Sequence, residues 1–540
     1  MGPEFMQGLT LSSAVDLPTE QFRELKTKLR DRWHELDDLN QADCDILVIP
    51  SLSLDQQELQ KVKGAHHYEE RLLFSLIRLR NPRARLIYVT SQPIHPSVID
   101  YYLQLMPGIP FSHARDRLLL FCTYDSSPQP LTQKILNRPR LIERLRRSIR
   151  TNQAYMTCFN STYLERDLAL QLGIPLLALD PDLLYWGTKS GSRQVFAEAD
   201  VPHPDGSKLV HTPDDLAQVA AELWERQPDL KRIVVKLNEG FSGGGNAILD
   251  LRSLQNVAPG TAATCDRMTA LSDRFEYLGF QCDGETWTHF SRRIPELGAI
   301  VEAFVEGEEK RSPSVQGYIH PDGKVEILST HDQILGGPDG QVFLGCTFPA
   351  DEAYRLQLQE YGLQVGENLA AKGALERFSL DFIAVRKPNT RNQWDLQAIE
   401  INLRKGGTTH PFMTLKLLTH GHYDYATGLF YNKQGTPKYY IATDNLQQDH
   451  YKGLLPSDLM DIIAQHDLHF NSTTETGNVF HLISCLSEYG KIGLTSIGNS
   501  PQEARELYDH VIAVLDKESR SAVDFGSYLT FPKISRQIAW

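Results

Sequence analysis

The chain has few cysteines, and they lack the spacing of a metal or redox site. Seven cysteines are scattered over 540 residues, and no two of them form a C-x-x-C pair. An odd number at irregular intervals does not describe a disulfide framework. We expect buried free thiols.

Long apolar runs are also missing. No segment approaches the run of about 18 apolar residues that spans a bilayer, and the N-terminus has no charged-then-apolar signal pattern. We therefore expect a cytoplasmic protein without a membrane partner. The opening MGPEF, residues 1–5, has the form of a cloning remnant and is left out of the fold prediction.

An excess of positive charge is absent as well. The formal net charge is −13 at pH 7, and there is no long basic tail. This balance argues against nonspecific binding to nucleic acid or to an anionic membrane, although a local basic pocket can still hold a phosphorylated ligand. The expected partners are small molecules, and formation of a homo-oligomer stays open.

What is present indicates several domains. At 540 residues the chain exceeds what one hydrophobic core usually supports, so two to four domains are expected. From Cys44 to about Leu179, β-rich runs such as CDILVIP alternate with amphipathic helices such as HHYEERLLFSLIRLR. That alternation predicts an α/β domain with a mainly parallel sheet. Its first strand-to-helix turn has no G-x-G-x-x-G, so no dinucleotide site is expected there.

Residues 396–411 read LQAIEINLRKGGTTHP and follow an apolar run with three functional groups. In a strand, Glu400, Asn402 and Arg404 would project from one face while the apolar residues between them pack on the other. A carboxylate and an amide oxygen suit Mg²⁺, and a guanidinium suits a phosphate or a carboxylate. The alternative is an edge strand with a solvated polar face.

A glycine-rich segment follows the strand-like run RIVVKLN, which contains Lys236. Backbone N–H groups of glycines can turn toward one bound anion, so this segment suits a cover over phosphates. A flexible hairpin is the competing interpretation, because the spacing is not that of a Walker A motif. The residues concerned are Gly240, Ser242, Gly243, Gly244 and Gly245.

Two further apolar segments carry acidic residues. The strand-like AIVEAF ends in acids, and a backbone left unpaired there can read an adenine edge while a following acid binds ribose hydroxyls. In FSLDFIAV, Asp381 stands in mid-strand and needs a strong partner, either Mg²⁺ shared with Glu400 or a nearby arginine. The adenine and ribose candidates are Glu302, Ala303, Val305 and Glu309.

The order of these features resembles the ATP-grasp superfamily over about residues 182–411. A lysine, a second lysine with a glycine loop, an acidic hinge, an aspartate on a strand and E-x-N-x-R follow one another. The resemblance implies an α/β and α+β fold. A Rossmann-like pre-ATP-grasp domain would span residues 6–180, two ATP-grasp lobes 181–411, and a C-terminal domain packing on them 412–540. The segment FHLISCLSEYGKIGLTSIGNSPQEA also resembles the closing segment of biotin-carboxylase-like members.

Carried over position by position, the resemblance implies how ATP would be held. Lys189 and Lys236 would be the two phosphate-binding lysines, and the loop 240–245 would cover the phosphates. The segment 302–305 would be the adenine hinge, and Glu309 would hold the ribose.

The resemblance also implies a metal site and leaves one role open. Asp381, Glu400 and Asn402 would hold Mg²⁺. Amino-acid ligases of the D-alanine type carry an arginine two residues before the metal aspartate, whereas this chain has Ser379. The oxyanion donor must therefore come from elsewhere, and the candidates are Arg404, which would also meet the phosphate or acyl-phosphate, Arg311 and His331.

Within the superfamily, the chain resembles the peptide-ligase group related to the pheganomycin-forming ligase. That resemblance implies an ADP-forming carboxylate–amine ligase that uses ATP and Mg²⁺ and joins amino acids or a small peptide through an acyl-phosphate. One alternative is a phosphotransferase that releases a phosphorylated small molecule. Another is a non-catalytic nucleotide-binding protein, but binding alone does not need two metal carboxylates. Biotin carboxylation is disfavoured because the chain lacks an M-K-M segment.

Overall fold

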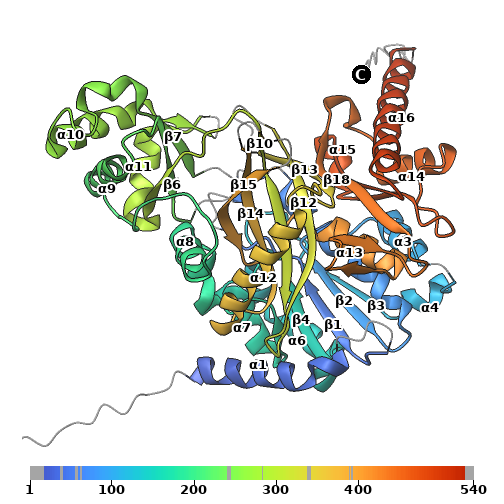
Figure 1. The fold of residues 1–540 in the computed structure, drawn as a ribbon. Coiled ribbons are helices and arrows are strands. Elements are labelled where there is room, and N and C mark those ends of the chain that lie inside the picture. Colours follow the sequence, from blue (N-terminus) through green and yellow to red (C-terminus); the bar gives the residue numbers. More distant parts are fainter. Residues whose placement is uncertain are drawn as a thin grey trace, which may run out of the picture.

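The computed structural model organises the chain around three β-sheets (Figure 1). Within the described residues no helix is both long and apolar enough to cross a membrane. The residues that the structure describes are 17–36, 41–54, 59–60, 62, 64–106, 108–239, 245–281, 284–336, 342–387, 390 and 393–528.

The first sheet lies where the sequence predicts alternating strands and helices. It has five parallel strands in the order β3-β2-β1-β4-β5, so the prediction of a parallel α/β domain is confirmed. The central strand is buried at every position, as expected for a strand covered on both faces. The strands are β1 (Asp45–Ile49), β2 (Arg85–Thr90), β3 (Leu118–Cys122), β4 (Ala154–Cys158) and β5 (Leu176–Leu177).

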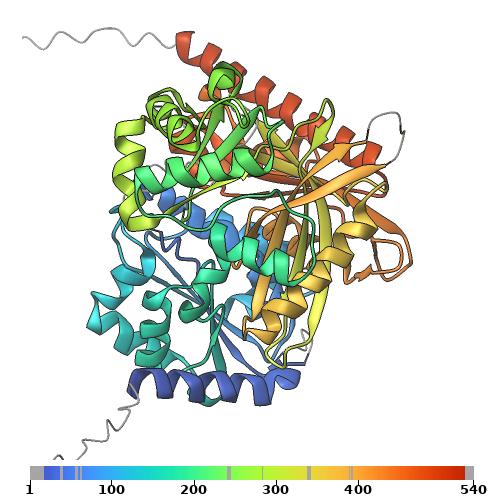
Figure 2. The same ribbon diagram turned by 60° about the vertical axis from the view of Figure 1, so that its left-hand side comes forward.

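Helices cover this sheet, and α1 runs along the base of the molecule (Figure 2). The local sequence defines their ends, as α7 shows. Thr162 caps its first turn by accepting from the amide of Leu164, and Gly173 ends it in the left-handed conformation with a φ of 68°. The helices are α1 (Leu17–Leu36), the 3₁₀ helix η1 (Ala65–Arg80), α3 (Pro96–Gln104), α4 (Phe111–Arg115), α5 (Leu131–Leu136), α6 (Pro139–Ser148) and α7 (Tyr163–Leu172).

The second sheet forms a small lobe that projects from the rest of the molecule at the upper left of Figure 1. Its antiparallel strands β6 (Arg232–Leu237), β7 (Asn246–Asp250), β8 (Gly279–Phe280) and β9 (Ala299–Ala303) follow the order β8-β7-β6-β9. β6 and β7 pair as antiparallel strands on the two sides of the glycine-rich segment, of which residues 240–244 lie outside the described residues. Apolar residues of these strands and of three helices form the lobe's own core. The helices are α9 (Pro213–Arg226), α10 (Thr264–Arg274) and α11 (Trp287–Leu297).

The third sheet has eleven strands and occupies the centre of the molecule. Helix α12 (Arg355–Ala371) covers one of its faces, where Leu358 packs in one core with Val315 and Leu380. The opposite face turns toward the N-terminal domain, and Leu328 and Phe348 share a core with residues of β1 and η1. The strands before residue 412 are β10 (Lys310–Arg311), β11 (Pro313–Ile319), β12 (Val325–Gly336), β13 (Val342–Phe348), β14 (Glu376–Arg386) and β15 (Trp394–Asn402).

The C-terminal residues extend this same sheet. β18 pairs with β13 and with β20, and β19 pairs with β20, so strand pairing joins the residues after 411 to the lobe before them. These strands are β16 (His422–Asp424), β17 (Leu429–Tyr431), β18 (Pro437–Gln447), β19 (Gly477–His481) and β20 (Lys491–Gly498). The α-helices not yet named are α8 (Lys189–Glu198), α13 (Thr409–Thr419), α14 (Pro456–Gln465), α15 (Cys485–Tyr489) and α16 (Pro501–Tyr528).

The described cysteines are free thiols, and most of them are buried. Cys44, Cys158, Cys346 and Cys485 are buried, as expected from the sequence. The expectation is wrong for Cys265, which is exposed, and Cys122 is half-buried. Cys282 lies outside the described residues.

Candidate active site

Four polar residues form one row across the large sheet. His331 in β12 pairs with Ser314 in β11, Ser314 pairs with Asp381 in β14, and Asp381 pairs with Glu400 in β15. Residues that lie directly opposite each other on neighbouring strands project from the same face. All four side chains therefore lie on the face away from α12.

A second polar row lies two residues further along the strands. Gln316 pairs with Ser329 on one side and with Ser379 on the other, and Ser379 pairs with Asn402. Ser379 is thus on the same face as Asp381. It stands where D-alanine-type ligases have an arginine, and it offers a hydroxyl instead. Two adjacent polar rows on one face of a sheet mark a candidate site, because the interior strands of such a sheet otherwise present apolar residues.

A β-bulge places Glu400 on this face. Along β15, Trp394, Leu396 and Ala398 point into the core under α12, so uninterrupted alternation would send Glu400 into the same core. The register shifts between Asp381 and Phe382, which pair with Glu400 and Ala398, and Ile399 is the extra residue. The bulge reverses the alternation, as bulges beside functional sites often do.

Glu400 forms an ion pair with Lys189, the first residue of α8. The Nζ of Lys189 lies 2.5 Å from the Oε1 of Glu400, and Lys189 is 6 % exposed. Burial alone would raise the pKa of Glu400, but the charge of Lys189 holds it below its ordinary value. Among the described strands β15 pairs with β14 alone, so it is an edge strand, but its polar face meets α8 instead of solvent.

The start of α8 is shaped by close packing. Thr188 caps the helix by accepting from the amide of Gly191 at 3.1 Å. A Cβ on Gly191 would lie 2.0 Å from the carbonyl oxygen of Tyr185, so only glycine allows this approach. Lys189 is therefore held at the point where the helix begins.

Asp381 is held by two side-chain amides. Gln333 donates to its Oδ1 at 2.6 Å and Asn402 donates to its Oδ2 at 2.9 Å. Burial raises the pKa of Asp381 to about 6, and the negative charge of Glu400 adds to this rise. The hydrogen-bond partners of this mid-strand carboxylate are thus neutral groups, and the positive charges of Arg404 and Lys189 offset only part of the rise in its pKa.

Arg404 lies beyond the end of β15, so strand alternation does not place it as the sequence predicted. It still reaches the site, since its Nη2 donates to the Oδ1 of Asn402 at 3.0 Å. Its Nη1 donates to the carbonyl oxygen of Lys405 at 3.1 Å. The guanidinium therefore borders the polar face beside Asn402.

Lys236, in the small lobe, is a second buried lysine that forms an ion pair with a glutamate. Its Nζ lies 2.5 Å from the Oε2 of Glu302 across the paired strands β6 and β9, and both side chains are buried. Arg193 of α8 lies 3.5 Å from the other oxygen of Glu302. Gly240, Ser242, Gly243 and Gly244 lie outside the described residues, and the described Gly245 accepts from the amide of Leu237 at 2.8 Å.

Asn238 joins the two lysines, and the sequence analysis missed it. The amide of Lys189 donates to its backbone oxygen at 3.1 Å, and the amide of Ser190 donates to its Oδ1 at 2.9 Å. The start of α8 is thereby fastened two residues after Lys236. The available signal was an amide side chain between the lysine strand and the glycine cluster.

The backbone of the predicted adenine hinge is only partly available for hydrogen bonds to a ligand. The amide of Ala303 donates to Asp205 at 2.8 Å and that of Phe304 donates to Arg232 at 3.3 Å, so the expectation of an unpaired backbone is wrong at these two amides. The carbonyl oxygen of Val305 accepts from Lys310 at 3.0 Å. No described residue accepts a hydrogen bond from the amide of Val305.

Glu309 is paired with cations. Its Oε2 lies 2.5 Å from Arg386 and its Oε1 lies 3.6 Å from Arg311. The carboxylate is only half-buried, so a ligand hydroxyl has access to it.

The three candidate oxyanion donors lie in different places. Arg311 pairs with Ala384, bonds to Asp351 at 2.6 Å and stacks 4.5 Å from the ring of Trp394. These partners belong to the face under α12, so the sheet separates Arg311 from Asp381, and the structure does not bring this candidate to the polar rows. Arg404 lies beside the polar rows, as described above.

His331 lies within the first polar row but is neutral. Its Nε2 lies 2.6 Å from the hydroxyl of Tyr440, and burial lowers its pKa to about 3. It offers the site one N–H donor and no positive charge.

This order of lysines, acids and E-x-N-x-R on these strands is typical of an ATP-grasp domain. Residues 183–270 and 281–426 match the family described as IQCH-like, ATP-grasp, and residues 458–511 match the PGM1 C-terminal domain. Residues 183–426 thus contain an ATP-grasp domain.

Two relatives match most of the chain. The L-propargylglycine–L-glutamate ligase of Streptantibioticus cattleyicolor is 28 % identical over 468 residues, which cover 85 % of this chain and 91 % of the relative. IQ motif-containing protein H of Danio rerio is 24 % identical over 439 residues, which cover 74 % of this chain and 41 % of that protein. Among solved structures, a biotin carboxylase from Campylobacter jejuni aligns with a TM-score of 0.49 at 14 % identity, over 85 % of this chain and 88 % of that one.

Proposed function

We propose that the protein is an ADP-forming ligase that uses ATP to join a carboxylate of one small molecule to an amine of another. The observation that carries this proposal is the meeting of Lys189 with Glu400 beside Asp381, because it brings a phosphate-binding cation and two acids together at one edge of the sheet. The similarity to an amino-acid ligase over most of both chains supports the same reaction.

ATP would lie between the small lobe and the polar face of the large sheet. Lys189 and Lys236 would exchange their carboxylate partners for phosphate oxygens, which accept charge-assisted hydrogen bonds equally well. The loop 240–245 would cover the phosphates. The amide of Val305 would read the adenine edge together with the hinge from Glu302, and Glu309 would hold the ribose.

The acidic row fits Mg²⁺. Asp381 and Glu400 are adjacent carboxylates, Asn402 adds an amide oxygen, and hard oxygen ligands of this kind suit that ion. Burial and then the charge of Glu400 raise the pKa of Asp381, and a cation bound between the two carboxylates would relieve their repulsion. Mg²⁺ bound there would neutralise charge on the transferring phosphoryl group.

The proposed reaction has two steps. A carboxylate is a poor electrophile, so the substrate carboxylate attacks the γ-phosphorus of ATP, the bond to the bridging oxygen of ADP breaks, and an acyl-phosphate forms. Lys189 and Lys236 would hold the phosphates in line for this transfer. The amine then attacks the acyl carbon, inorganic phosphate leaves with the bonding electrons, and an amide results. The loop 240–245 would exclude water, which would otherwise hydrolyse the acyl-phosphate.

Arg404 would stabilise the oxyanion of the second step. It is the charged candidate beside the polar face, and its bond to Asn402 orients it toward the acids. His331 would contribute as a neutral donor, since its pKa keeps it uncharged at physiological pH.

We propose amino acids or a small peptide as the substrates, on the similarity to a ligase named for two amino acids. The cytoplasmic location remains a prediction from the sequence, as does the possible formation of a homo-oligomer.

A screen of amino-acid pairs tests the proposal by following ADP and phosphate release, with mass spectrometry of the products. Release that requires two substrates and gives an amide supports it. Release with a single substrate and a phosphorylated product would make the protein a phosphotransferase. Binding of ATP without turnover for any pair would leave a nucleotide-binding protein.

A further inference from the structure

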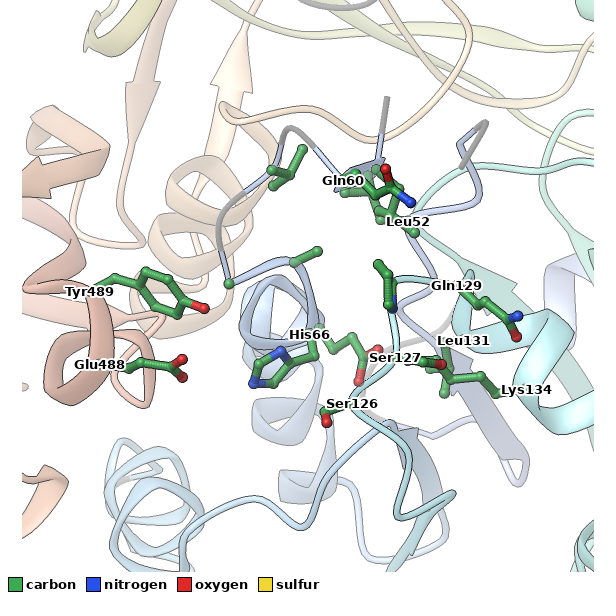
Figure 3. A pocket seen from close by; sticks show the side chains of 16 residues that line it. Leu52, Gln60, His66, Ser126, Ser127, Gln129, Leu131, Lys134, Glu488 and Tyr489 are labelled. Atoms are coloured by element: carbon green, nitrogen blue, oxygen red, sulfur yellow. The ribbon is translucent and has the colours of Figure 1, made fainter. Parts of the chain in front are cut away.

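A cavity of about 480 Å³ lies at the carboxyl edge of the N-terminal parallel sheet, apart from the candidate ATP site (Figure 3). Its walls come from the segments after β1 and β3, from the start of η1, and from α5 and α15. Ligands of open α/β sheets bind at this edge, and the volume falls in the usual range for a small-molecule site. Residues that line it include Leu52, His66, Ser127, Leu131, Lys134 and Glu488.

Lys134 is a buried cation in this cavity wall. It is 2 % exposed, and its Nζ donates to the hydroxyl of Ser91 and to the carbonyl oxygen of Asp125, each at 2.9 Å. No described carboxylate lies within the 4.0 Å of an ion pair with it. An ammonium has three donors, and a buried charge is normally paired, so the described partners leave a place for an acceptor from a ligand.

Ser91 links Lys134 to Glu69, a buried acid that also lines the cavity. Its hydroxyl donates to the Oε1 of Glu69 at 2.6 Å while it accepts from Lys134, and its amide donates to the Oε2 of Glu69 at 2.5 Å. Both oxygens of Glu69 are thus occupied by Ser91. The carboxylate fixes the hydroxyl that positions the ammonium.

The other side of the cavity is anionic and belongs to the C-terminal residues. Glu488 and Tyr489 of α15 lie opposite Gln129, Leu131 and Lys134, as Figure 3 shows. The side chain of Glu488 is 59 % exposed and accepts from the Nε2 of His67 at 3.4 Å. The cavity therefore offers a cation on one wall and an anion on the other, and the apolar Leu131 also lines it.

Short links connect this cavity to the candidate active site. Ser53, next to the cavity residue Leu52, exchanges two hydrogen bonds with Asn160, at 2.9 and 2.8 Å. The neighbouring Phe159 accepts from the amide of Lys405 at 3.1 Å. Lys405 directly follows Arg404. These bonds therefore hold the cavity wall and the end of β15, which carries Glu400 and Asn402, to the same edge of the N-terminal sheet.

We propose that this cavity binds an amino acid or short peptide as a zwitterion, with the ligand carboxylate on Lys134 and its ammonium group toward Glu488. The opposed charges match the two ends of such a ligand, and the polar and apolar residues of the lining suit its backbone and side chain. In the proposed ligase this ligand is the amine-bearing substrate. That second assignment rests on the proposed function, whereas the binding site itself does not.

Equilibrium binding of the standard amino acids and glycylglycine to the full chain, without ATP, tests the site. We expect at least one of them to bind and to raise the melting temperature. Lys134→Met should weaken this binding about tenfold or more, the range expected for loss of a charge-assisted hydrogen bond. Lys433→Met, at an exposed lysine outside the cavity, should leave it unchanged.

Ala65→Phe is the second variant, because Lys134 also supports Ser91 and its loss can impair folding. Ala65 lines the cavity from the start of η1, and a phenyl ring there fills the space without removing a charge. It should abolish binding while circular dichroism stays that of the wild type. The site is refuted if neither glycylglycine nor any amino acid binds the wild type, or if folded Ala65→Phe binds them as well as the wild type does.

Measuring ADP release separates the substrate from an effector. If the ligand is the amine substrate, Ala65→Phe should raise its KM at least tenfold or abolish turnover, with ATP affinity unchanged. If Ala65→Phe no longer binds the ligand but still releases ADP in a way that requires two substrates, the ligand is not the substrate. The cavity would then be an effector site. Binding without any ADP release in the wild type would refute the ligase and not the site.

Discussion

The ammonium of Lys189 lies 2.5 Å from the Oε1 of Glu400, so the first residue of α8 is bound to the strand that carries the metal candidates. Both groups have an electrostatic role without ligand, as partners in a mostly buried ion pair. In the proposed complex with ATP both would have a different role, with Lys189 bound to phosphate and Glu400 to Mg²⁺.

Glu400→Gln should lower kcat by about two to four orders of magnitude, because charge held by a metal contributes several kcal/mol at a transferring phosphoryl group. It should also lower the melting temperature without ligand, since Lys189 would be left buried and unpaired.

The double variant Lys189→Met with Glu400→Gln separates the two roles. Removing both charges should restore much of the melting temperature, because no unpaired buried charge remains, but it should not restore turnover. Melting curves and ADP release across a Mg²⁺ titration measure both properties. Near-normal activity of Glu400→Gln at low Mg²⁺ would contradict the metal role.

Lys236→Met should raise the Kd for ATP about tenfold to a hundredfold, since it removes a charge-assisted hydrogen bond to phosphate. The fold should persist, because Arg193 still lies 3.5 Å from Glu302. Lys231→Met, at an exposed lysine just before β6, is the matched control and should bind ATP normally. Isothermal titration checks both, and wild-type affinity in Lys236→Met would refute the assignment.

Arg404→Ala should affect mainly kcat, whereas Arg311→Ala should affect mainly the melting temperature. Arg404 borders the acids, so its loss should lower kcat about a hundredfold or more, as for removal of an oxyanion donor. Arg311 lies under α12 with Asp351 and Trp394, so its loss should lower the melting temperature and leave kcat within about threefold. The opposite pattern in steady-state kinetics would place the donor on the other face of the sheet.

The stability of the ligand-free protein should depend on Asp381 between about pH 4 and pH 6. Its pKa is raised from the ordinary 3.8 to about 6, mainly by burial and then by the charge of Glu400. In this window the folded state keeps a proton that the unfolded state has released, so the free energy of unfolding falls as the pH rises. Asp381→Asn should flatten this slope.

Mg²⁺ should give Asp381 the opposite effect on stability, so that the stabilisation by Mg²⁺ increases with pH. Because the cation binds the ionised carboxylate, its stabilising effect should grow as the pH rises through 6 and should disappear in Asp381→Asn. Melting temperatures at a series of pH values, with and without MgCl₂, measure both effects. A Mg²⁺ effect that is independent of pH would contradict the assignment of Asp381.

The sequence by itself determined the order of the functional groups and the kind of element that bears each one. Alternating β-rich and amphipathic segments predicted the parallel sheet, and the run around Lys236 predicted a strand, a loop and a strand. Both predictions rest on periodicity and turn chemistry, which act between residues close in the chain. The need of Asp381 for a partner was also readable, because its apolar neighbours are adjacent in sequence.

Only the tertiary structure decided which of these groups share a face. The bulge at Ile399 turns Glu400 out of the core, and it depends on how β15 pairs with β14, which no local pattern reports. The same pairing put Arg311 behind the sheet and gave Asp381 two amides instead of an arginine. The contact of Lys189 with Glu400 joins residues far apart in the chain, and it exists because α8 packs on the edge strand that the bulge has reversed.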